Sequence, residues 1–127
     1  MKNIIILENI RSAYNVGNVV RTADSLGRDV RIVGYTPSPL DHPKVLKTSL
    51  WAEKNIGLQQ FNFSGDAIQK AKELWMQVIA AELTEDAIDL GKFKPSCDTV
   101  AVIFWNEVEG VLENTDALNN YLAQFRD

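Results

Sequence analysis

Short runs of β-branched and aliphatic residues alternate with amphipathic helical segments along this chain, and that alternation constrains the fold more than any other feature. Five such runs predict strands, at 3–7, 30–35, 59–63, 76–81 and 99–104. Strands that alternate with helices indicate a parallel sheet covered by helices on both faces. The predicted class is therefore an α/β fold, with one domain spanning residues 1–127. The run at 99–104 is nearly all apolar and is predicted to be central.

Two segments between the strands have helical periodicity. The first runs from Asn15, a good N-cap, to Leu26, and Gly27 is a suitable C-terminal stop. The second runs from 65 to about 75 behind the predicted cap Ser64. The residues predicted to face inward are Val16, Val19, Val20, Ala23, Leu26, Ala67, Ile68, Ala71, Leu74 and Trp75. The proline-rich stretch 36–43 is predicted to be a loop, 44–54 a short helix followed by a loop, 84–95 connecting structure, and 114–126 a last amphipathic helix.

Composition bounds the class of protein. A chain that is 46% hydrophobic and 24% charged is typical of a soluble globular domain. No apolar run reaches the ~20 residues needed to cross a bilayer. The apolar run at the start of the chain is also too short for a signal peptide. The single cysteine, Cys97, predicts a cytoplasmic protein. No Cys/His cluster suggests a metal, and the lone His42 is predicted to be exposed rather than catalytic.

Charge is unevenly distributed. The net charge is −4, which argues weakly against a nucleic-acid partner, yet residues 1–54 carry eight basic and five acidic side chains, a net of +3 that leaves −7 for the rest. A phosphate-facing surface, if the chain has one, belongs in the first 54 residues. The alternative is that such asymmetry is ordinary in a small protein.

Ligands of open parallel sheets bind at the carboxyl ends of the strands. Three loops are predicted to leave those ends, at 8–14, 81–85 and 105–110. Polar residues in these loops are the site candidates.

Three segments carry the polar residues that could form such a site. The first, 15–23, opens a helix with Asn15 and carries Arg21 off the apolar face; the alternative is a helix cap and a solvated charge. The second, 104–111, follows a buried strand with an amide and two acids; the alternative is a polar turn before the next helix. The third segment, 47–53, does not by itself indicate a function.

In order, these segments resemble the SpoU (TrmH-like) branch of the SPOUT methyltransferases. The first family motif, an asparagine, a glycine and an arginine followed by Thr-Ala, is matched by Asn15, Gly17, Arg21, Thr22 and Ala23. A Lys-Thr-Ser-x-Gly-Ala-Glu stretch is matched by 47–53 except at one place. The second motif, Gly-Asn-Glu-x-x-Gly, is matched at Asn106, Glu107 and Gly110 with one departure. The resemblance runs from about Asn3 to Val111.

The resemblance implies a fold with a C-terminal trefoil knot, a homodimer, and transfer of a methyl group from S-adenosylmethionine to a ribose 2′-hydroxyl of tRNA or rRNA. Arg21 and Asn15 would be the catalytic pair, Asn15 orienting Arg21 or the ribose. The donor pocket would be formed by Trp105, Asn106, Glu107 and Gly110, with Ala81, Glu82 and Leu83 on its other wall. The RNA contacts would be Arg11, Arg21 and Lys47. No metal and no membrane are expected.

The chain departs from the family pattern in two ways. The third family motif, which ends a strand with Ile-Pro-Met and opens the last helix with Ser-Leu-Asn-Val, is not found before Asp127. We therefore expect a domain truncated at its C-terminus and an incomplete knot. In addition, Trp51 and Trp105 stand at family glycines, and Trp75 stands where a helix-ending glycine is expected.

One hypothesis covers the three tryptophans: a gene in which UGA encodes glycine has been translated with UGA as tryptophan. It predicts UGA at all three positions, and one UGG codon among them contradicts it. The alternative is three independent substitutions.

The alternative to an enzyme is a non-catalytic SpoU-like module, or an incomplete gene product, that contacts RNA or dimerises but binds no methyl donor. A small nucleotide-binding α/β protein outside the family is a third possibility, supported only by fold analogy.

Overall fold

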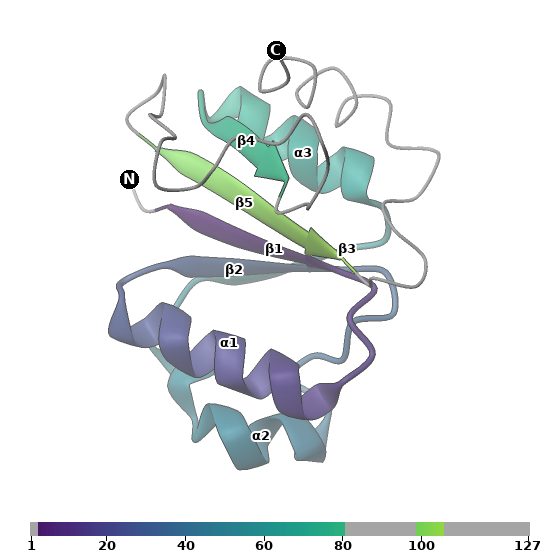
Figure 1. Ribbon diagram of the computed structural model, residues 1–127, viewed down its shortest axis with the longest axis vertical. Coiled ribbons are helices and arrows are strands. Elements are labelled where there is room, and N and C mark those ends of the chain that lie inside the picture. Colours follow the sequence, from purple (N-terminus) through teal and green to yellow (C-terminus); the bar gives the residue numbers. More distant parts are fainter. Residues whose placement is uncertain (1–2, 81–98, 106–127) are drawn as a thin grey trace, which may run out of the picture.

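A computed structural model describes residues 3–80 and 99–105. In this part of the chain, five strands form one parallel sheet in the order β3-β2-β1-β5-β4 (Figure 1). The strands are β1 (Ile4–Glu8), β2 (Asp29–Val33), β3 (Leu58–Phe61), β4 (Gln77–Ala80) and β5 (Val100–Trp105). The predicted α/β class and parallel sheet are confirmed. The strand at 100–105 lies inside the sheet as expected, although β1 holds the middle position.

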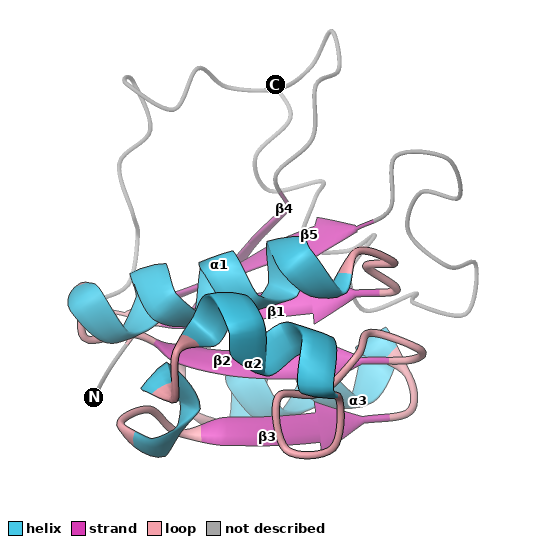
Figure 2. Cartoon of the chain, turned by 90° about the horizontal axis from the view of Figure 1, so that it is seen from below, coloured by secondary structure: helices cyan, strands magenta, loops and turns pink. Residues whose placement is uncertain are grey.

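Helices cover both faces of the sheet, as Figures 1 and 2 show from two sides. One face carries α1 (Ala13–Ser25), with α2 (Pro43–Ser49) and the one-turn helix η1 (Ala52–Lys54) packed against it. The other face carries α3 (Ser64–Glu73). Because β3 and β4 form opposite edges of the sheet, the segment that contains α3 passes from one edge to the other.

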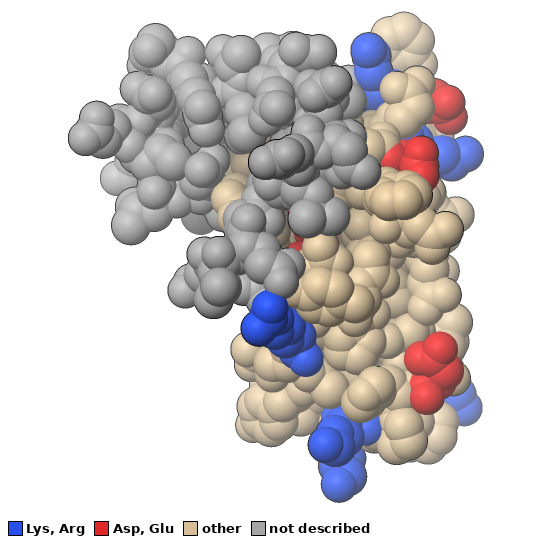
Figure 3. All heavy atoms as spheres, turned by 90° about the vertical axis from the view of Figure 1, so that its right-hand side faces the viewer, with Lys and Arg blue, Asp and Glu red and all other residues tan. Residues whose placement is uncertain are grey.

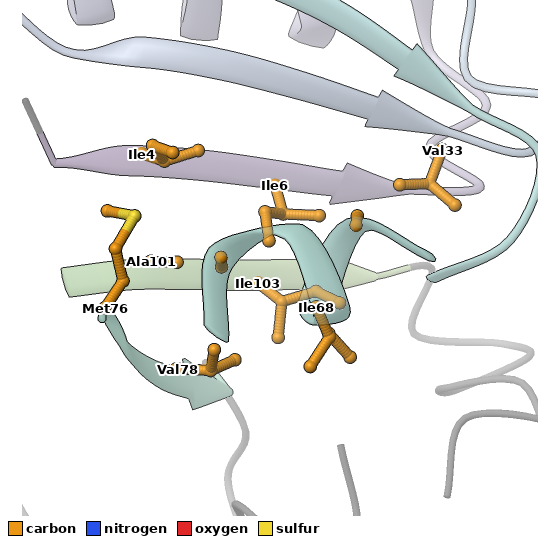
Figure 4. Close-up of a cluster of buried hydrophobic side chains, with 10 residues drawn as sticks. Ile4, Ile6, Val33, Ile68, Met76, Val78, Ala101 and Ile103 are labelled. Atoms are coloured by element: carbon orange, nitrogen blue, oxygen red, sulfur yellow. The ribbon is translucent and has the colours of Figure 1, made fainter. Parts of the chain in front are cut away.

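Each face has its own buried apolar cluster. The α3-side cluster contains Ile4, Ile6, Val33, Ala67, Ile68, Ala71, Met76, Val78, Ala101 and Ile103 (Figure 4). The α1-side cluster contains Leu7, Val16, Val20, Ala23, Val30, Ile32, Val45 and Ala52. Residues of β1 alternate between the two clusters, because successive side chains of a strand point to opposite faces. The run of isoleucines and leucine in β1 is therefore explained by burial on both sides.

The strand order reverses at β1: β2 and β3 extend to one side of it, and β5 and β4 lie on the other. At its carboxyl end, Glu8 is in register with Val33 of β2 and with Trp105 of β5. Strands β1, β2 and β5 therefore end at the same edge of the sheet, and the loops that follow β1 and β2 leave it side by side. We call this edge the carboxyl edge.

Several predicted helix boundaries are wrong by a few residues. Helix α1 is capped by Ser12, whose hydroxyl accepts a hydrogen bond from the amide of Asn15 at 3.1 Å, so Asn15 is inside the helix and is not its N-cap. The end at Gly27 is confirmed, with a left-handed φ of 66°. Phe63 holds the N-cap position of α3 without a side-chain hydrogen bond, and Ser64 is the helix's first residue.

Two apolar residues predicted to face inward do not. Leu26, at the C-cap of α1, is 59% exposed, because the helix ends before it can turn that side chain to the sheet. Trp75 is 86% exposed and lies beyond the end of α3. The other predicted inward residues of both helices are buried or pack partly buried against the two clusters.

The connections between elements partly match the sequence expectations. The stretch 44–54 contains α2, which begins at Pro43, and then η1. His42 is half-buried rather than exposed. Cys97, the connection at 84–95, the predicted helix at 114–126 and the knot segment fall outside the described residues. Among the helices in the described part of the chain, none is long and apolar enough to cross a membrane.

Candidate functional site

Two loops at the carboxyl edge are joined by hydrogen bonds. The hydroxyl of Thr36, in the loop after β2, accepts from the amide of Ile10 at 3.1 Å, and its proton is shared between the carbonyls of Val33 at 2.9 Å and Leu7 at 3.0 Å. Asn9, in the loop after β1, accepts through Oδ1 from the amide of Tyr35 at 3.1 Å. Thr36 and Asn9 are both buried. The two loops therefore form one fixed structure.

This junction depends on an unusual backbone. Asn9 has a left-handed φ of 50°, which asparagine tolerates better than most residues. Its Oδ1 lies where a Cβ on Gly34 would have to be, and Gly34 itself has a φ of 66°. The loop after β2 was not among the predicted site loops, because its prolines indicated only irregular structure. Its position after a parallel strand was the signal that could have identified it.

Exposed aromatic and basic side chains surround the two joined loops. Arg11 is exposed, and its Nε lies 3.4 Å from the hydroxyl of Tyr35. Tyr35 is 50% exposed, and Tyr14, in the first turn of α1, is 65% exposed. Figure 3 views the carboxyl edge and shows both basic and acidic side chains scattered over a largely uncharged surface. The predicted RNA contact Arg11 thus lies beside the ring of Tyr35, which no motif in the sequence had singled out.

The first motif lies on α1. Asn15 and Arg21 are both exposed, whereas Gly17 is buried between α1 and α2. Arg21 follows Asn15 by six helical positions, about 9 Å along the axis, and no hydrogen bond joins the two side chains. Arg21 lies about 12 Å along the helix from its first residue, away from the carboxyl edge.

The Lys47–Glu53 segment packs directly against the first motif. The hydroxyl of Thr48 donates to the carbonyl of Tyr14 at 3.0 Å, which joins α2 to the start of α1. Lys47 is exposed, and Glu53 is buried in η1. The structure therefore brings together two of the three segments that the sequence singled out, and it leaves Lys47 and Arg21 on the surface.

The second motif begins at the end of β5. Trp105 is the last residue of that strand and is half-buried against the α3-side cluster, so it is not in the loop where the sequence placed it. Next to it in register is Glu8, a carboxylate with no exposed surface, which was not selected from the sequence. Ala81, Glu82, Leu83, Asn106, Glu107 and Gly110 lie outside the described residues.

Two of the three unexpected tryptophans have a backbone conformation that favours glycine. Trp51 and Trp75 have φ values of 69° and 61°, which are rare for bulky residues. Both rings are exposed, and the Lys54 ammonium lies 4.6 Å from the centre of the Trp51 ring. Trp105 has no positive φ and extends β5. The backbone thus agrees with the misread-glycine hypothesis at two positions and gives it no support at the third.

Not every basic residue of the first 54 is available for phosphate. Arg31 is half-buried in β2, and its Nη1 donates to the carbonyls of Val30 and Gly57 at 3.3 and 3.4 Å. Burial lowers the pKa of Arg31, and the nearby Asp29 carboxylate acts in the opposite direction. Within residues 3–80 and 99–105, no group of three or more His, Cys, Asp or Glu side chains could hold a metal ion.

Comparisons with known proteins agree with this geometry. A curated relative, an uncharacterized tRNA/rRNA methyltransferase of Borreliella burgdorferi, is 27% identical over 119 residues, covering 91% of this chain and 51% of the relative. A solved structure of an AdoMet-bound rRNA methyltransferase from Sinorhizobium meliloti matches with a TM-score of 0.78 at 20% identity, covering 95% of this chain and 44% of that one. A solved RNA 2′-O ribose methyltransferase matches with a TM-score of 0.69 at 19% identity, covering 95% and 44%.

The chain spans about half the length of the curated relative it matches. The structural matches establish the fold, a five-stranded parallel sheet with helices on both faces. The profile of the SpoU rRNA Methylase family matches residues 2–125, almost the whole chain. The chain therefore belongs to the SpoU rRNA Methylase family.

Proposed function

We propose that residues 1–127 form one methyltransferase domain that moves a methyl group from S-adenosylmethionine to a ribose 2′-hydroxyl of tRNA or rRNA in the cytoplasm. The observation that carries the proposal is the register of Glu8 with Trp105, which brings the loop before the first motif and the start of the second motif to neighbouring strands. Membership of the SpoU family and the names of the similar proteins support the same reaction.

The methyl donor would bind where β4 and β5 end. These strands are parallel neighbours, and Ala80 is in register with Ile103, so β4 and β5 both end at the carboxyl edge. This arrangement fits a pocket with two walls, made of Ala81, Glu82 and Leu83 on one side and Trp105, Asn106, Glu107 and Gly110 on the other. When bound, the sulfonium of S-adenosylmethionine supplies an already activated methyl group. The protein's task is then mainly to position the ribose hydroxyl.

Arg21 is the proposed catalytic residue. A guanidinium keeps its proton in proteins, so Arg21 cannot act as an ordinary base. As the methyl group leaves the sulfonium and bonds to the ribose oxygen, the donor would become S-adenosylhomocysteine and the hydroxyl proton would pass to water. The fixed charge of Arg21 would contact an RNA phosphate and stabilise the negative charge that develops on the ribose oxygen. Asn15 has no hydrogen bond to Arg21 within the chain, so its proposed role is to orient the ribose.

The position of Arg21 favours action across a homodimer. Because α1 carries Arg21 about 12 Å from the start of the helix, the side chain lies far from the carboxyl edge of its own sheet. We propose that Arg21 of one subunit serves the donor site of the other. The RNA would also contact Arg11 and Lys47, which are exposed on the same basic half of the chain.

Mixed dimers test this arrangement. One subunit carries Arg21→Ala and the other carries Glu107→Ala in the donor pocket, and neither homodimer should transfer methyl groups. If Arg21 acts in trans, the mixed dimer regains one complete site and therefore measurable activity. A mixed dimer as inactive as both parents contradicts action in trans.

The second candidate function is a non-catalytic module that contacts RNA or a partner. The observation that favours it is Trp105, an indole at a position where the family pattern has glycine. Calorimetric titration of the chain with S-adenosylmethionine separates the two functions. Saturable binding supports the enzyme, whereas a folded protein that binds no donor supports the module. A Trp105→Gly variant that gains binding would identify the indole as the obstruction.

A further inference from the structure

We infer that Tyr35 and Arg11 form a stacking pair for an unpaired nucleotide of the RNA, next to the nucleotide that is methylated. This inference rests on the proposed function and adds to it the kind of RNA that the site accepts and the residues that select it. The exposed ring of Tyr35 and the exposed guanidinium of Arg11 come from different loops and meet at 3.4 Å between Nε and the hydroxyl.

The pair is held in place before any ligand arrives. The amide of Tyr35 donates to Asn9 Oδ1 at 3.1 Å, and the next residue, Thr36, bonds to the amide of Ile10 at 3.1 Å. Both anchoring side chains are buried. A half-exposed aromatic ring with a fixed backbone loses little freedom when a base stacks on it, which makes it a better binding surface than a ring on a mobile loop.

The chemistry of the pair fits single-stranded RNA. Unpaired bases stack on tyrosine rings and on arginine guanidinium planes, and the positive charge of arginine attracts the neighbouring phosphate. Duplex RNA offers neither its base faces nor a groove that a single ring can enter. Residues 1–54 have a net charge of +3, which is complementary to phosphate, and the carboxyl edge carries basic side chains among acidic ones (Figure 3).

The location of the pair assigns it to a neighbouring nucleotide. Tyr35 follows β2, whereas the proposed donor pocket follows β5, and β1 lies between these strands. Neighbouring strands are ~4.8 Å apart, so the stacking pair lies about 10 Å from the end of β5. The pair should therefore affect RNA affinity, and KM, more than the rate of the chemical step.

Tyr14 is a second exposed ring and is carried by the first turn of α1. It follows Arg11 by three residues, is 65% exposed, and is fixed through its carbonyl, which accepts from the Thr48 hydroxyl at 3.0 Å. A second base could stack there. Removing the Tyr14 ring should therefore weaken RNA binding. Removing both rings should weaken it more than removing Tyr35 alone.

The test is fluorescence anisotropy of the 127-residue chain with a labelled single-stranded RNA of about 12 nucleotides and with the same RNA annealed to its complement. Tyr35→Leu removes the aromatic ring but keeps an apolar side chain, and it should raise Kd for the single strand at least about 5-fold. Tyr35→Phe keeps the ring and should bind within about 3-fold of the unmodified chain. Trp75→Leu is the matched control, because it removes an exposed ring at the other end of the strands.

The inference is contradicted if Tyr35→Leu binds the single strand as well as the unmodified chain does, if Trp75→Leu weakens binding equally, or if the duplex binds as tightly as the single strand. If the unmodified chain binds S-adenosylmethionine and single-stranded RNA, and Tyr35→Leu has no effect on Kd, then the stacking pair is wrong. The methyltransferase proposal is not affected by that result. A chain that binds neither RNA contradicts both.

Discussion

Gly17 and Thr48 face each other where α1 crosses α2, and the Thr48 hydroxyl occupies the space that a side chain on residue 17 would need. The carbonyl oxygen of Val45 and the amide nitrogen of Ser49 lie 2.5 and 2.9 Å from the position that a Cβ on residue 17 would take. The glycine of the first motif is therefore explained by close packing of two helices. It joins the first motif to the segment that contains Lys47, so it contributes to the site only indirectly.

Replacing Gly17 with alanine should destabilise the fold. The added methyl group would meet backbone atoms of α2 that cannot move independently, and overpacking of this kind costs about 1–3 kcal/mol. The free energy of unfolding, measured by urea denaturation, should fall by that amount. Asn18→Ala, at the exposed neighbouring position of α1, is the control and should change stability by less than about 0.5 kcal/mol. A Gly17→Ala variant as stable as the parent chain would refute the packing argument.

Thr36→Val should loosen the junction of the two loops while nearly keeping the side chain's volume. Valine cannot accept the hydrogen bond from the amide of Ile10, which is partly buried, so its loss should cost about 1 kcal/mol, the low end of the range for an unpaired buried group. Thermal unfolding should show the loss. The matched control is Thr22→Val, because Thr22 is exposed on α1. Equal stabilities of the two variants would mean that the Thr36 hydroxyl does not hold the loops together.

The sequence predicted the sheet and its covering helices well, because the spacing of apolar residues along the chain follows directly from which side chains are buried. The β1 run is apolar at almost every position, as a strand buried on both faces must be. The sequence failed where a conformation depends on a tertiary partner. Ser12 rather than Asn15 caps α1 because both residue types suit the position and only the path of the preceding loop decides between them.

The sequence identified the motif residues of the site, but it did not identify the other residues that lie beside them on the folded surface. Arg21 and Lys47 could be selected because they match a family pattern, and both are exposed. Tyr35 was not selected, because it was predicted as the last residue of a strand and nothing in the proline-rich stretch after it indicates hydrogen bonds to the loop after β1. Glu8 is the first residue of the predicted loop 8–14, but it was not singled out, since complete burial of a carboxylate at a strand end has no sequence signal.

Trp75→Gly should stabilise the chain by about 0.5–1 kcal/mol, because a left-handed conformation costs a non-glycine residue ~1–2 kcal/mol and glycine returns part of this as chain flexibility. The ring is almost fully exposed, so little packing is lost. Trp105→Gly is the contrasting variant and should destabilise, since it removes a half-buried indole from β5. Chemical denaturation of both variants tests this, and a loss of stability in Trp75→Gly would contradict it.

Arg21→Ala should leave the fold intact and lower methyl transfer by at least about 100-fold, the effect expected when one stabilising group is removed from a developing anion. The melting temperature should not change, because the side chain is exposed on α1. Lys72→Ala on α3 is the control, since it removes an exposed positive charge on the other face of the sheet. Unfolding of the Arg21→Ala variant, or full activity, would remove Arg21 from its proposed role.

The most direct test of the central proposal is the product of the reaction. The chain is incubated with methyl-labelled S-adenosylmethionine and with tRNA and rRNA isolated from cells that lack its gene, and the RNA is digested to nucleosides and analysed by mass spectrometry. We expect label on a 2′-O-methylated nucleoside, absent with Arg21→Ala and present with Lys72→Ala. Label on a base, or no label in RNA from a chain that binds the donor, would contradict it.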